Sequence, residues 1–580
     1  MTGVTSVSAP PPPSSSPAPP PTAGGAAPSG GGRVRRRVRH PDLLLCGGLL
    51  LVHLVVHGAN LTGFPELADD EGTYLAQAWA VQHGEGLAHY TYWYDHPPLG
   101  WIQLAFLTWL PAAISPESLT VAPCRAALVV VGGVSAVLLY VLARRLQLPR
   151  WAAALAMALY GLSPLSVELL RKIFLDNIAV PWMLLAFILA ASPSRHLWHH
   201  FAAGLAAAVS VLSKETMLLV LPALLVTMWT HSHRDTRKFA VTGAITACVL
   251  LGLSYPLYAL LHGELLPADD RVSLTDALAF QLTRPGSGSM LDPESAARRT
   301  VGAWLQYDRV LPLAGGVAAV ALVETARWSR AARALAGPAL AVLLLAASVT
   351  LRPSGYIPAM FVIQALPFLA LSLAGTAAVL AKAVLRAGRH RMEHVSVTVI
   401  RWTLVGVLAA AAFWSAAPRW AAADRDALTT DANGPYRQAA AWMATYAEHP
   451  RSARVLVDDR LWLDLVHEGF RPRTGAIWFY KADLDPAVAR SLRHGWRSVD
   501  YVVSSHSLRT DAPRLPTVST ALAGSTRLAV FGSGPKRVEI REVDPDAFTK
   551  AGRGWARLGV PFSPSVRSGP TAPPRRPSPR

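Results

Sequence analysis

Three consecutive acidic residues open the segment Asp69-Asp70-Glu71-Gly72-Thr73-Tyr74. Carboxylates serve as general bases, and they also bind divalent cations. If a helix begins here, Asp70 and Tyr74 lie one turn apart on the same face. Acids in a first helical turn can instead cap backbone amides and complement the helix dipole. Three acids in succession exceed what a cap needs, which favours a functional role for this segment.

A second motif, Asp95-His96-Pro97-Pro98-Leu99-Gly100, follows the aromatic run Tyr90-Thr91-Tyr92-Trp93-Tyr94. The two prolines fix two φ angles and stiffen the chain, which holds Asp95 and His96 in place. The rings fit an aromatic belt at a membrane interface, or a platform on which the C–H faces of a sugar stack. Both interpretations stay open. Asp69, Asp70, Glu71, Asp95 and His96 could also gather a Mg²⁺ or Mn²⁺ ion, although their spacing does not require one.

The composition excludes an ordinary water-soluble enzyme. Of the 580 residues only 16% are charged and 52% are hydrophobic, whereas soluble domains carry about 25% charged residues. The formal net charge of +18 comes from short basic clusters between apolar runs, so a nucleic-acid partner is not expected. The cysteines Cys46, Cys124 and Cys248 lie in apolar stretches or at their edges and predict no disulfide framework. Lysine is rare, and occurs only at Lys172, Lys214, Lys238, Lys382, Lys481, Lys536 and Lys550.

Apolar runs of bilayer-spanning length recur along the chain and predict a polytopic α-helical membrane protein. We expect about eleven helices, near 43–60, 125–143, 151–168, 175–191, 198–213, 215–230, 239–261, 302–323, 334–351, 357–381 and 398–417. If the N-terminus is cytoplasmic, every short inner loop is basic. The first outer loop, residues 60–124, contains seven acids and no lysine or arginine. This asymmetry predicts a multi-pass protein of the cytoplasmic membrane with its N-terminus inside.

Four parts are expected along the chain. Residues 1–40 form a disordered Pro/Gly/Ser-rich cytoplasmic tail with a polybasic end, and residues 41–420 form the transmembrane module. Residues 421–550 follow an odd number of spans and are expected outside the membrane. Short apolar strands alternate there with helical stretches, which predicts a small extracytoplasmic α/β domain. Residues 551–580 are again rich in Pro, Arg and Ser and are expected to be disordered.

The pattern Asp70-Glu71-x-x-Tyr74, followed by Asp95-His96-Pro97-Pro98-Leu99-Gly100, resembles membrane glycosyltransferases of the GT-C class. Within that class the chain is similar to the superfamily of protein O-mannosyltransferases (glycosyltransferase family 39) and lipid A aminoarabinose transferases. The His-Pro-Pro-Leu-Gly string looks more like the mannosyltransferases, whereas aminoarabinose transferases tend to show Glu-Lys-Pro there. The likeness covers about residues 42–382 and is strongest before residue 220.

Three further segments are similar to segments of that superfamily. They are Arg171-Lys172-Ile173-Phe174-Leu175-Asp176-Asn177, Ser213-Lys214-Glu215, and Leu351-Arg352-Pro353-Ser354-Gly355-Tyr356. The resemblance implies that their cations meet a lipid phosphate, which arginine binds bidentately and lysine attracts as a point charge. Each segment also has a structural interpretation: Asp176 can cap a helix, Lys214 can snorkel, and Arg352 can anchor a helix end.

The resemblance implies an inverting glycosyltransferase that uses a polyprenyl-phosphate sugar. Asp70, or Asp69 in a shifted register, is then the base, with Glu71 beside it, and no cofactor is required. Mannosyl or arabinosyl transfer to a protein, lipid or polysaccharide outside the membrane fits this class. The expected substrate contacts are Tyr74, Asp95, His96, Arg171, Lys172, Asp176, Lys214, Glu215, Arg352 and Tyr356. The alternatives are a flippase or transporter of lipid-linked sugars, which would place ionisable groups near mid-membrane, and a non-enzymatic envelope scaffold.

Overall fold

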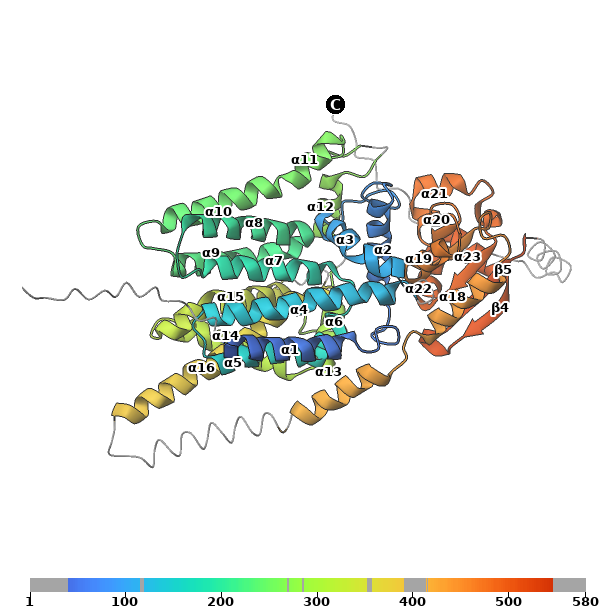
Figure 1. Cartoon of the computed structure of the whole chain (residues 1–580). Helices are drawn as coiled ribbons and strands as arrows, with labels where there is room; N and C mark the ends of the chain where they lie inside the picture. Colours follow the sequence, from blue (N-terminus) through green and yellow to red (C-terminus); the bar gives the residue numbers. More distant parts are fainter. Residues whose placement is uncertain are drawn as a thin grey trace, which may run out of the picture.

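The computed structural model describes residues 40–114, 119–268, 271–283, 286–351, 357–390, 414 and 416–545. Within them a bundle of helices lies beside an α/β part formed by the end of the chain. Helices α2 (Asp69–Gln82) and α3 (Leu99–Ile114) lie between the two (Figure 1). We call residues 434–545 the C-terminal region. The expected terminal tails and nearly all of the expected span at 398–417 lie outside the described residues.

Apolar helices build the bundle, as expected of a multi-pass membrane protein. Among the described residues, five stretches are long and apolar enough to cross a bilayer. Three lie within single helices: Pro41–Gly58 in α1 (His40–Gly58), the whole of α4 (Val121–Arg145), and Arg330–Thr350 in α15 (Arg330–Leu351). Two are formed by consecutive helices: Arg237–Leu261 by α10 (Arg237–Gly252) and α11 (Ser254–Leu261), and Ala359–Ala383 by η2 (Ala359–Gln364) and part of α16 (Leu366–His390). Five shorter apolar helices accompany them: Leu99–Trp109 in α3, α7 (Leu175–Ala190), α8 (Leu197–Ser213), Glu215–His231 formed by η1 (Glu215–Val220) and α9 (Leu221–His231), and α14 (Val310–Thr325). The expected number of eleven spans is not confirmed by the described residues.

Two expected spans are broken, and the two breaks contact each other. The run at 302–323 divides at Asp308 into α13 (Ala296–Tyr307) and α14, because the Asp308 Oδ1 atom accepts the Val310 N–H at 2.7 Å and starts a new helix. The run at 151–168 divides at Ser163 into α5 (Arg150–Leu162) and α6 (Pro164–Leu169), where Pro164 supplies no N–H. The Ser163 hydroxyl donates to Asp308 Oδ2 at 2.6 Å, so a buried polar contact joins the two breaks.

The C-terminal region contains a five-stranded sheet with strand order β2-β1-β3-β5-β4. The strands are β1 (Val455–Val457), β2 (Ala476–Trp478), β3 (Tyr501–Ser504), β4 (Ser525–Phe531) and β5 (Val538–Val543). β1 runs parallel to β2 and β3, with Val455 opposite Ala476 and Tyr501, whereas β5 is antiparallel to β3 and β4. Strands β1, β2 and β3 are buried along their whole length, and β2 forms one edge of the sheet. The helices around the sheet are α18 (Gly434–Tyr446), α19 (Asp459–His467), α20 (Lys481–Leu484), α21 (Pro486–Ser491), α22 (His506–Asp511) and α23 (Pro516–Ala523).

Helix α2 is packed tightly against α19. An added Cβ atom at Gly72 would lie 2.0 Å from the backbone oxygen of Asp459, so only glycine permits this approach. The hydroxyl of the next residue, Thr73, donates to Asp459 Oδ2 at 2.5 Å. Asp459 is the second residue after the carboxyl end of β1 and the first residue of α19. The first turn of α2 is therefore held against the carboxyl edge of the parallel strands.

We expect Gly72→Ala to push α2 away from α19 and to lower the thermal unfolding temperature. Overpacking of this kind typically costs about 1–3 kcal/mol. Gly58→Ala is the matched control, because no atom lies within 4 Å of the Cβ position there. The measurement is thermal unfolding of both purified variants in detergent. Equal unfolding temperatures would contradict the close packing of α2 on α19.

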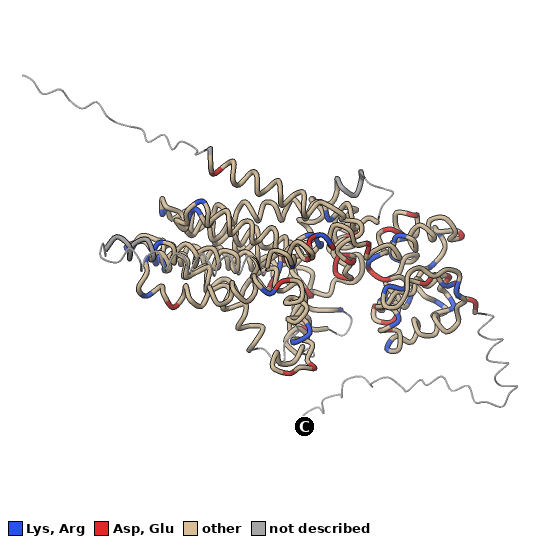
Figure 2. Tube along the Cα trace, turned by 90° about the horizontal axis from the view of Figure 1, so that it is seen from below, with Lys and Arg blue, Asp and Glu red and all other residues tan. Residues whose placement is uncertain are grey.

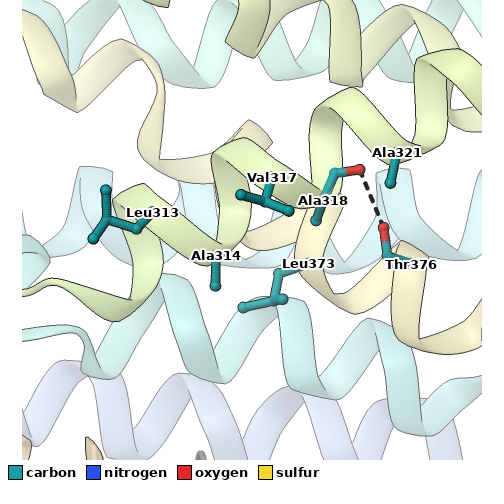
Figure 3. Close-up of a pocket in the computed structure, with 7 residues that line it drawn as sticks. All are labelled: Leu313, Ala314, Val317, Ala318, Ala321, Leu373 and Thr376. Atoms are coloured by element: carbon teal, nitrogen blue, oxygen red, sulfur yellow. Dashed lines mark hydrogen bonds between the residues drawn. The ribbon is translucent and has the colours of Figure 1, made fainter.

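An apolar groove lies on the bundle between α14 and α16 (Figure 3). It is lined by Leu313, Ala314, Val317, Ala318, Ala321, Leu373 and Thr376. The Thr376 hydroxyl donates to the Ala318 carbonyl at 3.3 Å, so the one polar lining side chain is already paired. None of the candidate site residues lines this groove, and no charged side chain does. Acidic and basic residues lie together where the bundle meets the C-terminal region, and others lie at the far end of the bundle and across the C-terminal region (Figure 2).

Candidate functional site

The three acids at the start of α2 turn toward three different surroundings. Asp69 is half-buried and pairs with Arg460 of the C-terminal region, with 2.9 Å between Oδ1 and Nε. Glu71 points into the bundle and pairs with Arg125 of α4. Asp70 is half-buried, and the positive charges of Lys214 and His96 act on its carboxyl group. Of the three acids, Asp70 is therefore the one whose pKa is affected by Lys214 and His96.

Glu71 has the role of a buried structural anion. Its Oε1 and Oε2 atoms accept from Arg125 Nε and Nη2 at 2.8 and 2.6 Å, and both side chains are completely buried. Glu71 also accepts the N–H groups of Ile173 and of Ala68, the residue before α2, both at 3.0 Å. These contacts pair Glu71 with Arg125, and its expected place beside the base stays a prediction. The capping interpretation applies to Glu71 and not to Asp70.

Lys214, His96 and Glu215 contact one another, and we call them the Lys214 cluster. Lys214 Nζ lies 3.2 Å from His96 Nε2 and 3.7 Å from Glu215 Oε1. His96 Nδ1 lies 3.0 Å from Glu215 Oε2. Burial disfavours the imidazolium ion, but the Glu215 carboxylate outweighs this effect and raises the pKa of His96. The cluster therefore contains two nitrogen groups that can carry positive charge beside one carboxylate.

Local backbone structure brings the two halves of the Lys214 cluster together. α8 ends at Ser213, and Lys214 adopts an extended conformation before the 3₁₀-helix η1 begins at Glu215. At Gly100 an added Cβ atom would lie 2.6 Å from the Ser213 carbonyl oxygen, so this glycine lets the end of the His-Pro-Pro-Leu-Gly string touch the end of α8. The His96 carbonyl also accepts from Tyr92 Oη at 2.6 Å. The string thus presents His96 to Lys214.

The electrostatics of Asp70 suit a base. Burial raises the pKa of the Asp70 carboxyl, Lys214 and His96 lower it, and the neighbouring acids Asp69 and Asp95 raise it again, so the net direction is upward. A general base works best when its pKa approaches the working pH. Asp95 is exposed, and its negative charge also acts on His96 and Lys214.

Two further predicted contacts lie near the Lys214 cluster. Tyr74 is buried, and its ring centroid lies 6.1 Å from that of His96. Asp176 is buried in the first turn of α7, and its Oδ1 accepts from Gln364 Nε2 at 2.6 Å. It makes no capping hydrogen bond, so the capping interpretation of Asp176 is not seen. Its negative charge acts on Lys214.

Arg171 and Lys172 have partners other than the Lys214 cluster. Arg171 is fully buried and donates to the carbonyls of His57, at 2.9 Å, and Ala59, where α1 ends. Lys172 pairs with Glu168 at 2.9 Å. Unpaired carbonyls at a helix end and a carboxylate one turn away are favourable partners for these cations, and the expected contact of Arg171 and Lys172 with a lipid phosphate stays a prediction. Arg352 and Tyr356 lie outside the described residues.

Sequence reasoning missed Arg125, Gln364 and Arg460. Arg125 carried a usable signal, because it is a charge at the start of an otherwise apolar run and such residues need a buried partner. Gln364 and Arg460 carried no such signal. The sequence around them does not indicate their partners, Asp176 and Asp69, which are distant in the chain.

Two of the acids considered as metal ligands have different ion-pair partners: Asp69 pairs with Arg460, and Glu71 pairs with Arg125. Among the described residues, no group of three or more His, Cys, Asp or Glu side chains is placed to hold a metal ion. The five residues considered from the sequence therefore do not form one ligand set in this arrangement.

Residues 95–258 match the family model described as dolichyl-phosphate-mannose-protein mannosyltransferase. The fold is similar to ArnT from Cupriavidus metallidurans, solved with undecaprenyl phosphate, at a TM-score of 0.53 and 15% identity over 87% of this chain and 98% of that chain. It is also similar to the oligosaccharyltransferase of Archaeoglobus fulgidus in its apo form, at a TM-score of 0.50 and 13% identity over 83% and 73% of the two chains. No curated protein sequence matches the chain.

The chain is a glycosyltransferase of the GT-C class. The resemblance inferred from its motifs is thereby confirmed. In this GT-C glycosyltransferase the matched range includes every member of the Lys214 cluster but not Asp70. The roles of the individual residues rest on the geometry described above.

Proposed function

We propose that this glycosyltransferase moves a sugar from a polyprenyl-phosphate donor to an acceptor hydroxyl with inversion at the anomeric carbon. The proposal rests on one observation, which is that α2 adjoins the Lys214 cluster: the Tyr74 ring, one turn after Asp70, lies 6.1 Å from the His96 ring, and the charges of Lys214 and His96 act on the Asp70 carboxyl group. A lipid-phosphate donor is supported by the similar fold of ArnT, whose structure holds undecaprenyl phosphate. The mannosyltransferase family model favours mannose, and arabinose is the second candidate.

Each side chain has a definite part in the proposed step. The acceptor oxygen bonds to the anomeric carbon while the bond from that carbon to the phosphate oxygen breaks. Asp70 takes the acceptor proton, and Lys214 with protonated His96 stabilises the charge that develops on the leaving phosphate. Glu215 favours the protonated form of His96, in keeping with the raised pKa of His96. One direct displacement inverts the configuration and forms no covalent glycosyl-enzyme.

The proposed location is the cytoplasmic membrane, with the N-terminus inside and the C-terminal region outside. The positive-inside pattern supports this orientation, because the loop that carries Asp70 has no lysine or arginine from residue 60 to 124. The site then lies on the outer face of the membrane, where the acceptor is a protein, a lipid or a polysaccharide.

Lys214→Ala tests the phosphate site. We expect it to lower transfer about 10²–10³-fold, as removal of one donor to a developing anion typically does. The assay uses proteoliposomes supplied with labelled polyprenyl-phosphate mannose or arabinose, together with envelope membranes of a deletion strain as acceptor. Lys238→Ala is the matched control, because Lys238 is exposed at the start of α10. An unchanged rate in Lys214→Ala would remove the proposed phosphate site.

The same preparation separates the enzyme from the flippase. Liposomes that contain the protein and the labelled donor, but no acceptor, report movement of the lipid-linked sugar between leaflets. The proposed enzyme leaves that distribution unchanged. Movement without transfer would support the transport alternative instead.

A further inference from the structure

The aromatic segment Tyr90–Tyr94 leads directly into Asp95 and His96, and the C-terminal region holds its beginning. Tyr90 Oη accepts the backbone N–H of Trp478 at 3.0 Å and lies 3.4 Å from the Ala476 carbonyl, to which it donates. Both groups belong to β2. The Thr91 N–H points to Asp485 Oδ2 at 3.4 Å. The segment is thus attached to the edge of the sheet before it reaches the Lys214 cluster.

Lys481 completes this attachment. Its Nζ atom lies 3.5 Å from the centroid of the Trp93 ring and 5.5 Å from that of Tyr90. The lysine is only 4% exposed, and its nearest carboxylate, on Asp485, is 3.8 Å away. A cation over an aromatic face is held more strongly when both are removed from water. Burial also lowers the pKa of Lys481 to about 8, so the contacts must offset a real cost of keeping this lysine inside.

The other side of the same segment holds His96. Tyr92 Oη donates to the His96 carbonyl at 2.6 Å, and Tyr255 Oη donates to the Tyr94 carbonyl at 3.2 Å. Trp93 lies between Tyr92 and Tyr94 in the sequence, so its position affects both of these hydrogen bonds. A shift of Trp93 would displace the backbone that presents the His96 ring to Lys214 and Glu215.

We propose that Lys481 is a positioning residue of the active site: by holding Trp93, it fixes the chain that presents His96 to the donor phosphate. The inference rests on the proposed role of His96 in donor binding. It gives the C-terminal region a part in the reaction, since a side chain of α20 acts on the Lys214 cluster through the aromatic segment. Lys481 does not itself touch the reacting atoms.

Lys481→Met, measured alone and together with His96→Gln, tests this inference. We expect Lys481→Met to lower kcat/KM for the polyprenyl-phosphate sugar about 10–100-fold, as small displacements of catalytic groups do. Lys481→Arg is expected to restore most of the loss, because a guanidinium also binds over an aromatic face. In the His96→Gln background, Lys481→Met is expected to add no further loss. Lys536→Met, at an exposed lysine far along the same region, is the control.

The outcomes separate the inference from the proposed function. If His96→Gln lowers transfer to a measurable residual rate and Lys481→Met lowers that rate further, Lys481 does not act through His96 and the inference alone is overturned. If His96→Gln keeps full activity, the proposed donor contact itself is wrong. If Lys481→Met fails to fold, Trp93→Phe takes its place in the same cycle and is expected to lower transfer only when His96 is present. A loss of equal size in both backgrounds would overturn the inference.

Discussion

Asp70→Asn is expected to lower sugar transfer about 10²–10⁴-fold, the usual contribution of a general base. The amide keeps the shape of the side chain but cannot take the proton of the acceptor hydroxyl. The measurement is transfer from labelled polyprenyl-phosphate sugar in proteoliposomes. Asp69→Asn is the control at the neighbouring acid, because Asp69 forms an ion pair with Arg460. A large loss in Asp69→Asn and none in Asp70→Asn would make Asp69 the base.

The same Asp70→Asn variant is expected to unfold at an equal or higher temperature than the wild type. The pKa of Asp70 is raised in the folded protein, chiefly by burial. A carboxyl with a raised folded pKa favours the folded state fully only at a pH below its unfolded value near about 4, and that contribution is lost as the pH rises through the folded pKa. At pH 7 the ionised group is therefore a cost that asparagine removes. A lower unfolding temperature would contradict this placement of Asp70.

Glu71→Gln is expected to have the largest effect on stability, about 3–5 kcal/mol, because it leaves the buried Arg125 guanidinium without its counter-charge. Both side chains of this pair are 0% exposed. Glu324→Gln is the matched control, since it breaks an exposed pair with Arg327 that is expected to contribute about 0–1 kcal/mol. Thermal unfolding in detergent measures both. Glu71→Gln should lower the amount of folded enzyme more than the turnover of each folded molecule.

The stability that Glu71 provides should also depend on pH in a known direction. Burial alone would raise the pKa of Glu71, but Arg125 outweighs it, so the folded pKa is below the usual value. A depressed folded pKa means that the stabilisation is present above the unfolded pKa near about 4.3 and is lost as the pH falls further. Unfolding temperatures of wild type and Glu71→Gln should therefore approach each other in acid. A constant difference down to pH 3 would show that charge pairing is not the cause.

Local sequence signals predicted the elements of the site well. The helix expected at the triple acid begins at Asp69, and His96 of the His-Pro-Pro-Leu-Gly string lies beside Lys214 and Glu215. The short gap between two apolar runs located Lys214 at a helix end, where an extended residue separates α8 from η1. These features depend on neighbours in the sequence, so capping, proline geometry and apolar periodicity were enough.

The contacts of Arg171 show what such reasoning does not reach. Its motif resembles a phosphate-binding segment, and the sequence did not indicate that the carbonyls at the end of α1 would accept from its Nε and Nη2 groups. No local pattern announces that a helix end from more than a hundred residues earlier will be adjacent. The break at Asp308 was missed for a similar reason, because its partner Ser163 comes from another helix.

The sequence alone determined that this chain is a membrane protein, which loop carries its acids, and which enzyme class its motifs resemble. Only the tertiary structure decided which of three adjacent acids faces the Lys214 cluster. Successive helical residues point about 100° apart, so Asp69, Asp70 and Glu71 must enter different surroundings. What occupies those surroundings is set by Arg460, Lys214 and Arg125, which are remote in the chain and meet only through packing.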